Sequence, residues 1–428
     1  MLEDLRGQGP PGDIGTFVSP ASVIVYQHTF SGTTYFVAAR QGDRGWVLIP
    51  NGHGTVFSTV LQSALALSVP IFIMAGNYLI TVTISLASNV FLVGQCESTR
   101  LYATANITLI QSIGTGGTHI VNTGISDMWL QGSRAGNGHG LQVDYTDYLR
   151  VENCRIQSNG ANSAGTTGCG IYADHTAFAC IRNNRIIDNG GNGFELIRTT
   201  NSVIAHNYLG GDTQGVTANT RGIRLITGSQ YNTVSENAIR YCRSQGIELT
   251  DASNSNTLGY NTIYYNDQFG IEIYNSLYNS VEGNVVDHAA DASGIRLDTN
   301  ANYNSIVANL VTTGRGTESG IHVVGSNSNT VNGNILKSNG GYGILVDANS
   351  DENQFIGNRT ALNSLGSVNV ANANCDRNLF TNNHFDEGNI TDAGTNTRAW
   401  LNYDPSANVF IATINAPLVI GGGGGALP

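Results

Sequence analysis

A repeat of about 24 residues is the feature of this sequence that most restricts its fold. Two asparagine motifs recur in the same phase: Asn-(Thr/Ser)-(Val/Leu/Ile) from Asn232 to Asn329, and Asn-x-(Ile/Val/Leu) from Asn153 to Asn334. Such self-similarity predicts a solenoid, because a single repeat buries its apolar residues only by stacking on its neighbours. The third motif, Gly-Ile-x-(Leu/Val/Ile), starts at Gly222, Gly246, Gly270, Gly294, Gly320 and Gly343.

Each repeat contains three short segments in which apolar and polar residues alternate, as they do in β-strands. Equivalent strands of successive repeats can pair about 4.8 Å apart, so that their aliphatic residues fill one continuous core. We therefore predict an all-β protein, a parallel β-helix in which each coil of about 24 residues has three strands. Longer steps in the repeat predict turn insertions at Ala161–Thr167 and Asp212–Asn219.

The recurring asparagines predict a structural ladder. An Asn side chain at a turn can hydrogen-bond to the equivalent amide of the next coil and to backbone groups that would otherwise be buried without a partner. We expect this ladder to run from Asn153 to Asn334 and on to Asn358 and Asn383. Glycine at strand entries and tight turns explains why the chain has 53 glycines.

The segment before the repeats carries a more specific pattern. Residues Val56–Leu67 have helical spacing, and they are followed by Ile71–Tyr78 (IFIMAGNY) and Ser88–Gln95 (SNVFLVGQ). This order resembles the N-terminal cap and first coils of the pectate-lyase-like superfamily, which includes polysaccharide lyases, galacturonases, uronan epimerases and bacteriophage tailspikes. The resemblance covers about residues 45–385. It implies a single-stranded right-handed parallel β-helix with an N-terminal capping helix.

Three regions are predicted along the chain: an N-terminal arm or linker (1–44), the β-helix (45–385), and a C-terminal cap with a Gly-rich tail (386–428). Within the arm, we expect Val23–Tyr26 and Thr34–Ala38 to pair as a hairpin.

The net charge and the N-terminal sequence restrict which partners and which location the protein can have. The net charge of −11 argues against a nucleic-acid partner, and the apolar stretches are too short to span a membrane. The acidic Met1–Arg6 segment does not resemble a Sec signal peptide, and we expect an extracellular or virion-associated protein. The six cysteines are widely spaced, which favours free thiols. A Cys154–Cys169 or Cys154–Cys180 disulfide is the alternative.

The residue that follows each Gly-Ile pair is predicted to point outward, because its neighbours point inward. Glu248 and Glu272 then lie on adjacent strands, roughly 5 Å apart. This is near the separation of the two carboxyl groups of a retaining glycosidase. Because their charges are alike, the pKa of one of the two glutamates is expected to be raised. We predict that Glu248, Glu272 and Glu195 are catalytic. This predicted column consists of Gln142, Tyr172, Glu195, Arg224, Glu248, Glu272, Arg296, His322 and Leu345.

Other residues in or near the column are predicted to bind substrate. Arginines suit a uronic-acid or sulfate group, and tyrosines can stack on sugar rings. The alternative is an ordinary surface ladder, in which each Glu–Arg pair contributes a few tenths of a kcal/mol. The predicted substrate-binding residues are Arg224, Arg296, His322, Tyr172, Tyr264 and Asp267.

No catalytic set of the resembled families is complete. Gly138-His139-Gly140 matches one element of the galacturonases, and Asp174-His175 falls short of the Asp-Pro-His-Asp motif of alginate epimerases. No metal site or cofactor is predicted. A calcium-binding site would have to use scattered residues such as Asp251, which form no consensus calcium-binding loop.

The resemblance and the composition together favour a tailspike-like protein, a homotrimer that binds and depolymerises a cell-surface or extracellular polysaccharide. A secreted polysaccharide lyase, hydrolase or uronan epimerase is the first alternative. A non-catalytic β-helix used for adhesion or as a structural fibre is the second.

Overall fold

The computed structural model describes residues 23–42, 45–161, 168–211, 218–287, 292–312, 316–387, 390–405 and 409–411. The chain divides into two compact units, Met1–Ile271 (unit 1) and Glu272–Pro428 (unit 2). Both units are parallel β-helices whose coils contain three short strands, which confirms the predicted fold class. The predicted Gly-rich tail and most of both turn insertions lie outside the described residues.

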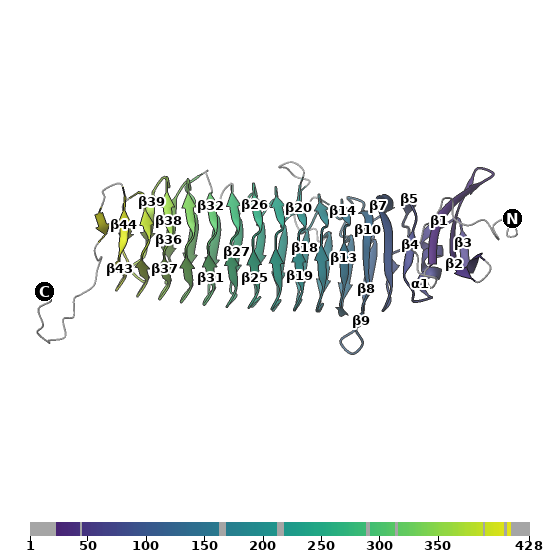
Figure 1. Ribbon diagram of the computed structural model, residues 1–428, viewed down its shortest axis with the longest axis horizontal. Helices are drawn as coiled ribbons and strands as arrows, with labels where there is room; N and C mark the ends of the chain where they lie inside the picture. Colours follow the sequence, from purple (N-terminus) through teal and green to yellow (C-terminus); the bar gives the residue numbers. More distant parts are fainter. Residues whose placement is uncertain are drawn as a thin grey trace, which may run out of the picture. The chain divides into compact units, whose positions relative to one another are not determined.

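Unit 1 contains three series of parallel strands, which we call sheets 1, 2 and 3 (Figure 1). Sheet 1 consists of β6 (Ile84–Ser85), β8 (Ile110–Ile113), β11 (Leu141–Asp144), β15 (Ile171–Asp174), β18 (Phe194–Ile197), β21 (Ile223–Ile226) and β24 (Ile247–Leu249). Sheet 2 contains β4 (Ile71–Ile73), β13 (Arg150–Glu152), β16 (Cys180–Arg182), β19 (Val203–Ala205), β22 (Thr233–Ser235) and β25 (Thr257–Gly259). Sheet 3 contains β5 (Gly76–Leu79), β14 (Arg155–Gln157), β17 (Arg185–Ile187), β20 (Tyr208–Gly210), β23 (Ala238–Arg240) and β26 (Thr262–Tyr264). The long strands β7 (Phe91–Tyr102) and β10 (Gly124–Gln131) contribute to both sheets 2 and 3, and β9 (Ile120–Val121) pairs with β12 (Thr146–Asp147).

The three sequence motifs correspond to the three strands of a coil. The Gly-Ile motif forms sheet 1, where Phe194, Ile223 and Ile247 are register partners and are all buried. Stacking identical positions places aliphatic side chains in one core, and it is the burial of this core that makes such short strands stable.

An asparagine ladder runs along the start of sheet 3. Asn184 donates its backbone N–H to the Oδ1 of Asn207 (3.0 Å), which donates to Asn237 in turn (2.9 Å). The prediction of a ladder is confirmed, but its predicted start at Asn153 is wrong. Cys154 occupies that position instead, because two residues rather than one separate Asn153 from the core isoleucine; the Cys154 N–H donates to Asn184 Oδ1 (2.9 Å).

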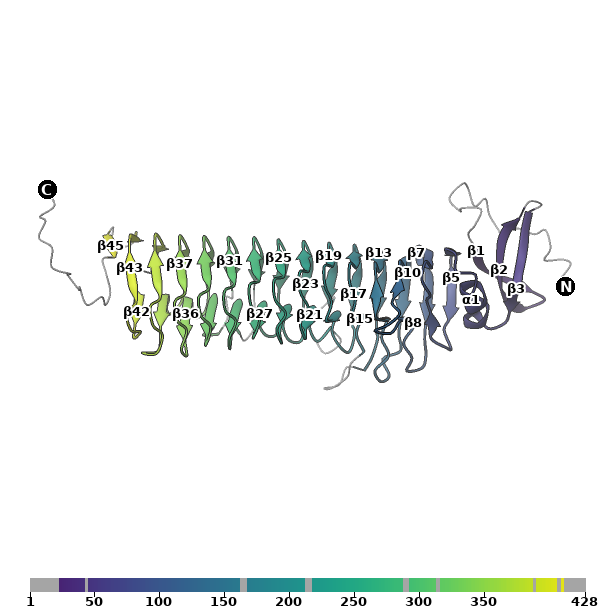
Figure 2. The ribbon, with the colours of Figure 1, turned by 90° about the horizontal axis from the view of Figure 1, so that it is seen from below.

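The N-terminal end of unit 1 is covered by a helix and a hairpin. The predicted helix is α1 (Phe57–Leu65), and the predicted hairpin is β1 (Val23–Phe30) paired antiparallel with β2 (Thr33–Gly42). β2 also pairs with β3 (Gly45–Gly54), and Figure 2 shows these strands beyond α1. Since β1 pairs in parallel with β4, residues 23–30 extend the β-structure of the first coil.

Unit 2 repeats the three-strand coil. Its first series contains β27 (Ile271–Tyr274, entering from unit 1), β30 (Ile295–Asp298), β33 (Ile321–Val324), β36 (Tyr342–Asp347), β39 (Gly366–Val370) and β42 (Ile390–Asp392). The second contains β28 (Ser280–Glu282), β31 (Ser305–Val307), β34 (Thr330–Asn332), β37 (Gln354–Ile356), β40 (Leu379–Thr381) and β43 (Arg398–Trp400). The third contains β29 (Val285–Asp287), β32 (Leu310–Thr312), β35 (Ile335–Lys337), β38 (Arg359–Ala361), β41 (His384–Phe385) and β44 (Asn402–Asp404), and β45 (Val409–Ile411) pairs antiparallel with β44.

Two further properties of the chain follow from the structure. All six cysteines are free, as the wide spacing predicts, and five of them are fully or partly buried. Within the described residues, no helix has the length and apolar character needed to cross a membrane.

Candidate active site

Three bulky side chains occupy the same turn position directly after three neighbouring strands of sheet 1. Tyr145, His175 and Arg198 follow β11, β15 and β18, and their φ angles are 45°, 47° and 48°. The register partners Asp144 and Asp174 close the first two of these strands. The same turn position is left-handed after β21 as well, at Thr227 (φ 54°), so the positive φ belongs to the coil geometry, and what distinguishes these three residues is their chemistry.

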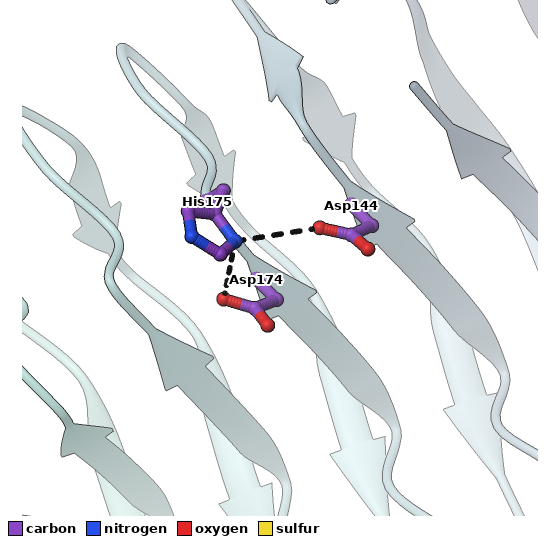
Figure 3. Close-up of side chains that lie close together, drawn as sticks. All are labelled: Asp144, Asp174 and His175. Carbon is purple, nitrogen blue, oxygen red and sulfur yellow. Dashed lines mark ion pairs between the residues drawn. The ribbon is translucent and has the colours of Figure 1, made fainter. Parts of the chain in front are cut away.

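His175 lies between two carboxylates (Figure 3). Its Nδ1 is 3.0 Å from Asp174 Oδ1 and 3.7 Å from Asp144 Oδ1. The Tyr145 ring stacks on the imidazole, with centroids 4.2 Å apart and an interplanar angle of 12°. We call Asp144, Tyr145, Asp174, His175 and Arg198 the His175 cluster.

Charges within the His175 cluster are unevenly compensated. Arg198 donates to both carboxylate oxygens of Asp174, with a distance of 2.9 Å from Nε to Oδ1, and this hydrogen bonding raises the pKa of Arg198. Burial, followed by the charge of Asp174, raises the pKa of Asp144, while His175 opposes this shift. Asp144 is therefore easier to protonate than an ordinary aspartate, and Asp174 is the carboxylate that Arg198 contacts. The side chains of His175 and Asp144 are each 32% exposed, so a substrate can reach them.

A second histidine, His119, lies beside Tyr145 on the preceding coil. His119 Nδ1 is 2.8 Å from Asp147 Oδ2, and the His119 ring is 5.5 Å from that of Tyr145. Two imidazoles, each oriented by an aspartate, therefore flank one tyrosine.

The predicted outward column lies on the same face of sheet 1, beside the His175 cluster. Tyr172 precedes Asp174 by two residues on β15, and the register continues through Glu195 and Arg224 to Glu248, as predicted. Arg224 pairs with both acids, at 3.2 Å from Glu195 and 2.7 Å from Glu248.

The column is less open than strand alternation predicts. Glu248 is only 8% exposed, because Arg221 also pairs with it at 2.8 Å and both arginines cover its carboxylate. Burial is the main cause that raises the pKa of Glu195, and the charge of Arg224 opposes it. Burial likewise raises the pKa of Tyr172, with a further contribution from Asp174.

Gln142 continues the column in unit 1 as the register partner of Tyr172, and Glu272, Arg296, His322 and Leu345 belong to unit 2. Glu272 lies in β27 and is 9% exposed. Arg296 is a register partner of His322 and pairs with Asp298 at 2.7 Å. Burial, followed by the charge of Arg296, lowers the pKa of His322 to about 4. The closeness of Glu248 to Glu272 stays a prediction.

Tyr264 and Asp267 do not belong to this column. Tyr264 is the last residue of β26 in sheet 3, where it contacts Arg240. Asp267 lies in the turn after β26 and donates its backbone N–H to Cys242 O (2.9 Å). The predicted proximity of Tyr264 to the column is wrong, because Tyr264 ends the Asn-x-Ile strand and not the Gly-Ile strand of its coil.

Most of the His175 cluster is not among the predicted site residues. Asp174-His175 matches only part of the alginate epimerase motif, which by itself does not predict a site. The signal that identifies the cluster is positional: Tyr145, His175 and Arg198 each follow directly after a Gly-Ile-type strand, and these strands are in register.

The His175 cluster also has the donors for a metal ion. One ligand atom from each of Asp144, Asp174 and His175 lies within 4.8 Å of the other two. An imidazole with two carboxylates suits a transition metal better than calcium, which prefers oxygen ligands alone.

His139, from the partial galacturonase motif, has a structural role. It is 9% exposed, and its Nδ1 accepts the backbone N–H of Cys169 (3.1 Å), so this nitrogen must be unprotonated. Burial lowers its pKa from 6.5 to about 4.

We expect this histidine to make the protein sensitive to acid. The unfolded chain binds a proton at His139 near pH 6.5 but the folded protein only near pH 4, so stability is complete above 6.5 and falls as the pH drops toward 4. The loss from this residue is about 3 kcal/mol at most. Urea midpoints measured from pH 7 to 4 should fall less steeply for His139→Gln than for the wild type. Identical pH dependence would contradict the prediction.

Comparisons with known proteins identify the architecture. A family model described as a right handed beta helix region matches residues 79–222 and 169–334, which together span more than half of the chain. A model described as periplasmic copper-binding protein (NosD) matches residues 263–415. A comparison with curated protein sequences finds no match.

Solved structures share the fold at low identity. The A-module of mannuronan C-5 epimerase AlgE6 from Azotobacter vinelandii is similar with a TM-score of 0.64 and 15% identity, over 81% of this chain and 94% of that chain. The AlgE4 A-module from the same organism has a TM-score of 0.56 and 17% identity, over 68% and 86%. The pre-mature gene product 12 of bacteriophage phi29 has a TM-score of 0.58 and 13% identity, over 83% and 56%.

Proposed function

Because this chain belongs to the family of right-handed β-helix proteins, we propose that it binds an acidic polysaccharide along sheet 1 of unit 1 and modifies its uronic-acid residues by proton transfer. The observation that carries this proposal is the His175 cluster, where an imidazole, a phenol and two carboxylates converge at an accessible position beside an arginine. Residues of these types exchange protons with a substrate near neutral pH.

The chemistry follows from the acidity of a uronic-acid residue at C5, the carbon that carries the carboxylate. A base removes the C5 proton, and the electron pair of the C–H bond moves toward the carboxyl group, where cationic or hydrogen-bonding groups stabilise it. His175 or Tyr145 is placed to act as the base. Asp144, whose pKa is raised by burial and by the charge of Asp174, lies 3.7 Å from His175 Nδ1, where it helps to orient the imidazole. Return of a proton to the other face of C5 gives an epimer, whereas cleavage of the C4–O bond gives an unsaturated sugar and a shorter chain.

The comparisons support this substrate class. Two of the similar structures are named mannuronan C-5 epimerases, and mannuronan is a polymer of uronic acid. The column beside the cluster supplies Tyr172 and the Glu195–Arg224 pair, which we propose contact neighbouring sugar units.

Deuterium incorporation at C5 tests the proposal most directly. The protein is incubated in D₂O with polymannuronate, polygalacturonate or neutral dextran, and the products are followed by proton NMR and by the absorbance of unsaturated uronates. We expect deuterium in a uronan and none in dextran. The proposal fails if neither deuterium nor unsaturated product appears with any acidic polymer.

A hydrolytic alternative would use the predicted catalytic carboxylates Glu195, Glu248 and Glu272. The raised pKa of Glu195 favours it, since a general acid must be protonated. Under that alternative, Glu248→Gln and Glu272→Gln lose about a hundredfold in kcat. We expect instead that both variants keep the chemical rate, with weaker binding where Arg224 loses its partner. Measured kcat and KM decide between the two reactions.

The tailspike part of the hypothesis concerns assembly and location. The likeness to a phage protein supports a virion-associated role, and the NosD family match supports a periplasmic or extracellular one. A homotrimer would have three times the 45.3 kDa mass of the chain, which light scattering after size-exclusion chromatography measures directly.

A further inference from the structure

A second chemically distinctive surface of unit 1 lies on sheet 3, away from the strands that carry the His175 cluster. Along it, arginine and aromatic side chains alternate on the outward side of successive strands. We call this the Arg–aromatic stripe. It consists of Arg100 (β7), Trp129 (β10), Arg155 (β14), Arg185 (β17), Tyr208 (β20), Arg240 (β23) and Tyr264 (β26).

The first part of the stripe is a sandwich around Trp129. Arg100 and Arg155 are its register partners on the two neighbouring strands, and their guanidinium carbons lie 4.5 and 4.7 Å from the indole ring. Cation–π contacts on both sides hold the two guanidinium groups in fixed positions.

The second part repeats this arrangement around Tyr208. The guanidinium carbon of Arg185 lies 5.1 Å from the Tyr208 ring and that of Arg240 lies 4.8 Å from it. Arg240 also donates to the hydroxyl of Tyr264 (3.3 Å).

The junction between the two parts places like charges side by side. Arg155 and Arg185 are direct register partners on adjacent strands, so these two arginines lie one strand spacing apart. Glu97 pairs with Arg155 at 3.1 Å, but its side chain is 59% exposed, so this pair contributes little. Four of the 20 basic residues of a chain with net charge −11 are thus gathered on one stripe.

We propose that the Arg–aromatic stripe is a second polysaccharide-binding site, which holds the carboxylate or sulfate groups of an acidic glycan on its guanidinium groups. Each guanidinium has five N–H donors, and the contacts of Arg100 and Arg155 use only some of them. The strand spacing of about 4.8 Å is comparable to the length of one sugar unit in an extended chain. Arg155 and Arg185 are one strand apart and the other neighbouring arginines are two strands apart, so acidic groups one or two sugar units apart can meet them.

The stripe suits an acidic glycan better than a nucleic acid. Binding of single-stranded nucleic acid depends on open aromatic faces on which bases stack. The Trp129 faces are covered by guanidinium groups on both sides, which leaves charge and not stacking as the means of recognition.

Binding of the full-length protein to polygalacturonate, measured by titration calorimetry in the His175→Ala background so that no polymer is consumed, tests this inference. We expect the double variant Arg155→Gln/Arg185→Gln to bind at least about tenfold more weakly and with a smaller salt dependence. The matched control is Arg150→Gln/Arg182→Gln, which removes two charges from exposed arginines on sheet 2 that pair with Glu152. This control should bind as the parent does.

A third variant separates the contribution of the charge from that of the planar guanidinium group. Arg155→Lys keeps the charge but loses the planar group that stacks on Trp129, and we expect intermediate affinity. Urea midpoints of all variants show whether they remain folded. The inference is overturned if the folded double variant binds polygalacturonate as tightly as the control, or if a single-stranded oligonucleotide binds the stripe more tightly than the polymer does.

The choice of a uronan as the probe rests on the proposed function, whereas the charge pattern of the stripe does not. The two ideas therefore fail separately. If the stripe binds polygalacturonate but the wild-type protein gives neither deuterium nor unsaturated product with any acidic polymer, the proposed function is wrong and the stripe stands. If the wild-type protein incorporates deuterium but the double variant binds like its control, the stripe is wrong and the proposed function stands.

Discussion

Replacing His175 with alanine is expected to lower the rate of C5 deuterium incorporation into a uronan by about a hundredfold to ten-thousandfold, the usual contribution of a positioned acid–base group. The reason is geometric: His175 is the imidazole that contacts both Asp174 and Asp144 and stacks on Tyr145. Its removal takes away the proton carrier and the ring that contacts both carboxylates.

The matched control for this substitution is His206→Ala. His206 is also a histidine at a positive-φ turn position of unit 1, but it follows a strand of sheet 2, is 51% exposed and pairs only with Glu236 at 3.4 Å. Its removal should leave the rate within a few-fold of the wild type. A His175→Ala variant that retains the wild-type rate, with an unchanged urea midpoint, would remove the His175 cluster from the mechanism.

Replacing Asn334 with alanine is expected to destabilise unit 2 by about 4 kcal/mol. The Oδ1 of this buried amide accepts both the backbone and the side-chain N–H of Asn309 (2.9 Å each). Its Nδ2 donates to Ile306 O (2.8 Å) and to Asn358 Oδ1 (2.9 Å). Alanine leaves these groups buried without partners, and each unsatisfied group costs about 1–3 kcal/mol, partly relieved by relaxation.

Asn332, two residues earlier on β34, is the control for this second substitution. Its side chain is exposed, so Asn332→Ala should change the free energy of unfolding by no more than about 0.5 kcal/mol. Urea unfolding followed by circular dichroism measures both variants. Equal midpoints for the two would show that the ladder amides do not stabilise the fold.

Much of the fold could be predicted because its determinants are local and repeated. Strand alternation, glycine at strand entries and asparagine at turns recur every coil, so each copy supports the same assignment. The error at Asn153 shows the limit of this reasoning. A single additional residue between Asn153 and the core isoleucine gives the ladder position to Cys154; the segment Asn153-Cys-Arg-Ile156 departs from the Asn-x-Ile spacing at this coil.

The site could be predicted only in part. Register placed Tyr172, Glu195, Arg224 and Glu248 in one column, as expected from their motif positions. The strand register predicted from the motifs does not reveal that arginines cover the Glu248 carboxylate. Side-chain pairing depends on rotamers and on neighbours such as Arg221, which lies outside the motif.

The sequence by itself determined the parallel β-helix, its three-strand coil and the outward column, because one periodic pattern specifies them all, and it determined the capping helix through the helical spacing of Val56–Leu67. Only the tertiary structure brought Tyr145, His175 and Arg198 together and aligned arginines and aromatic rings along sheet 3. These residues are about one coil apart in the chain, and variable turn lengths separate them. Their meeting depends on strand register and on left-handed turn geometry, which no local pattern encodes.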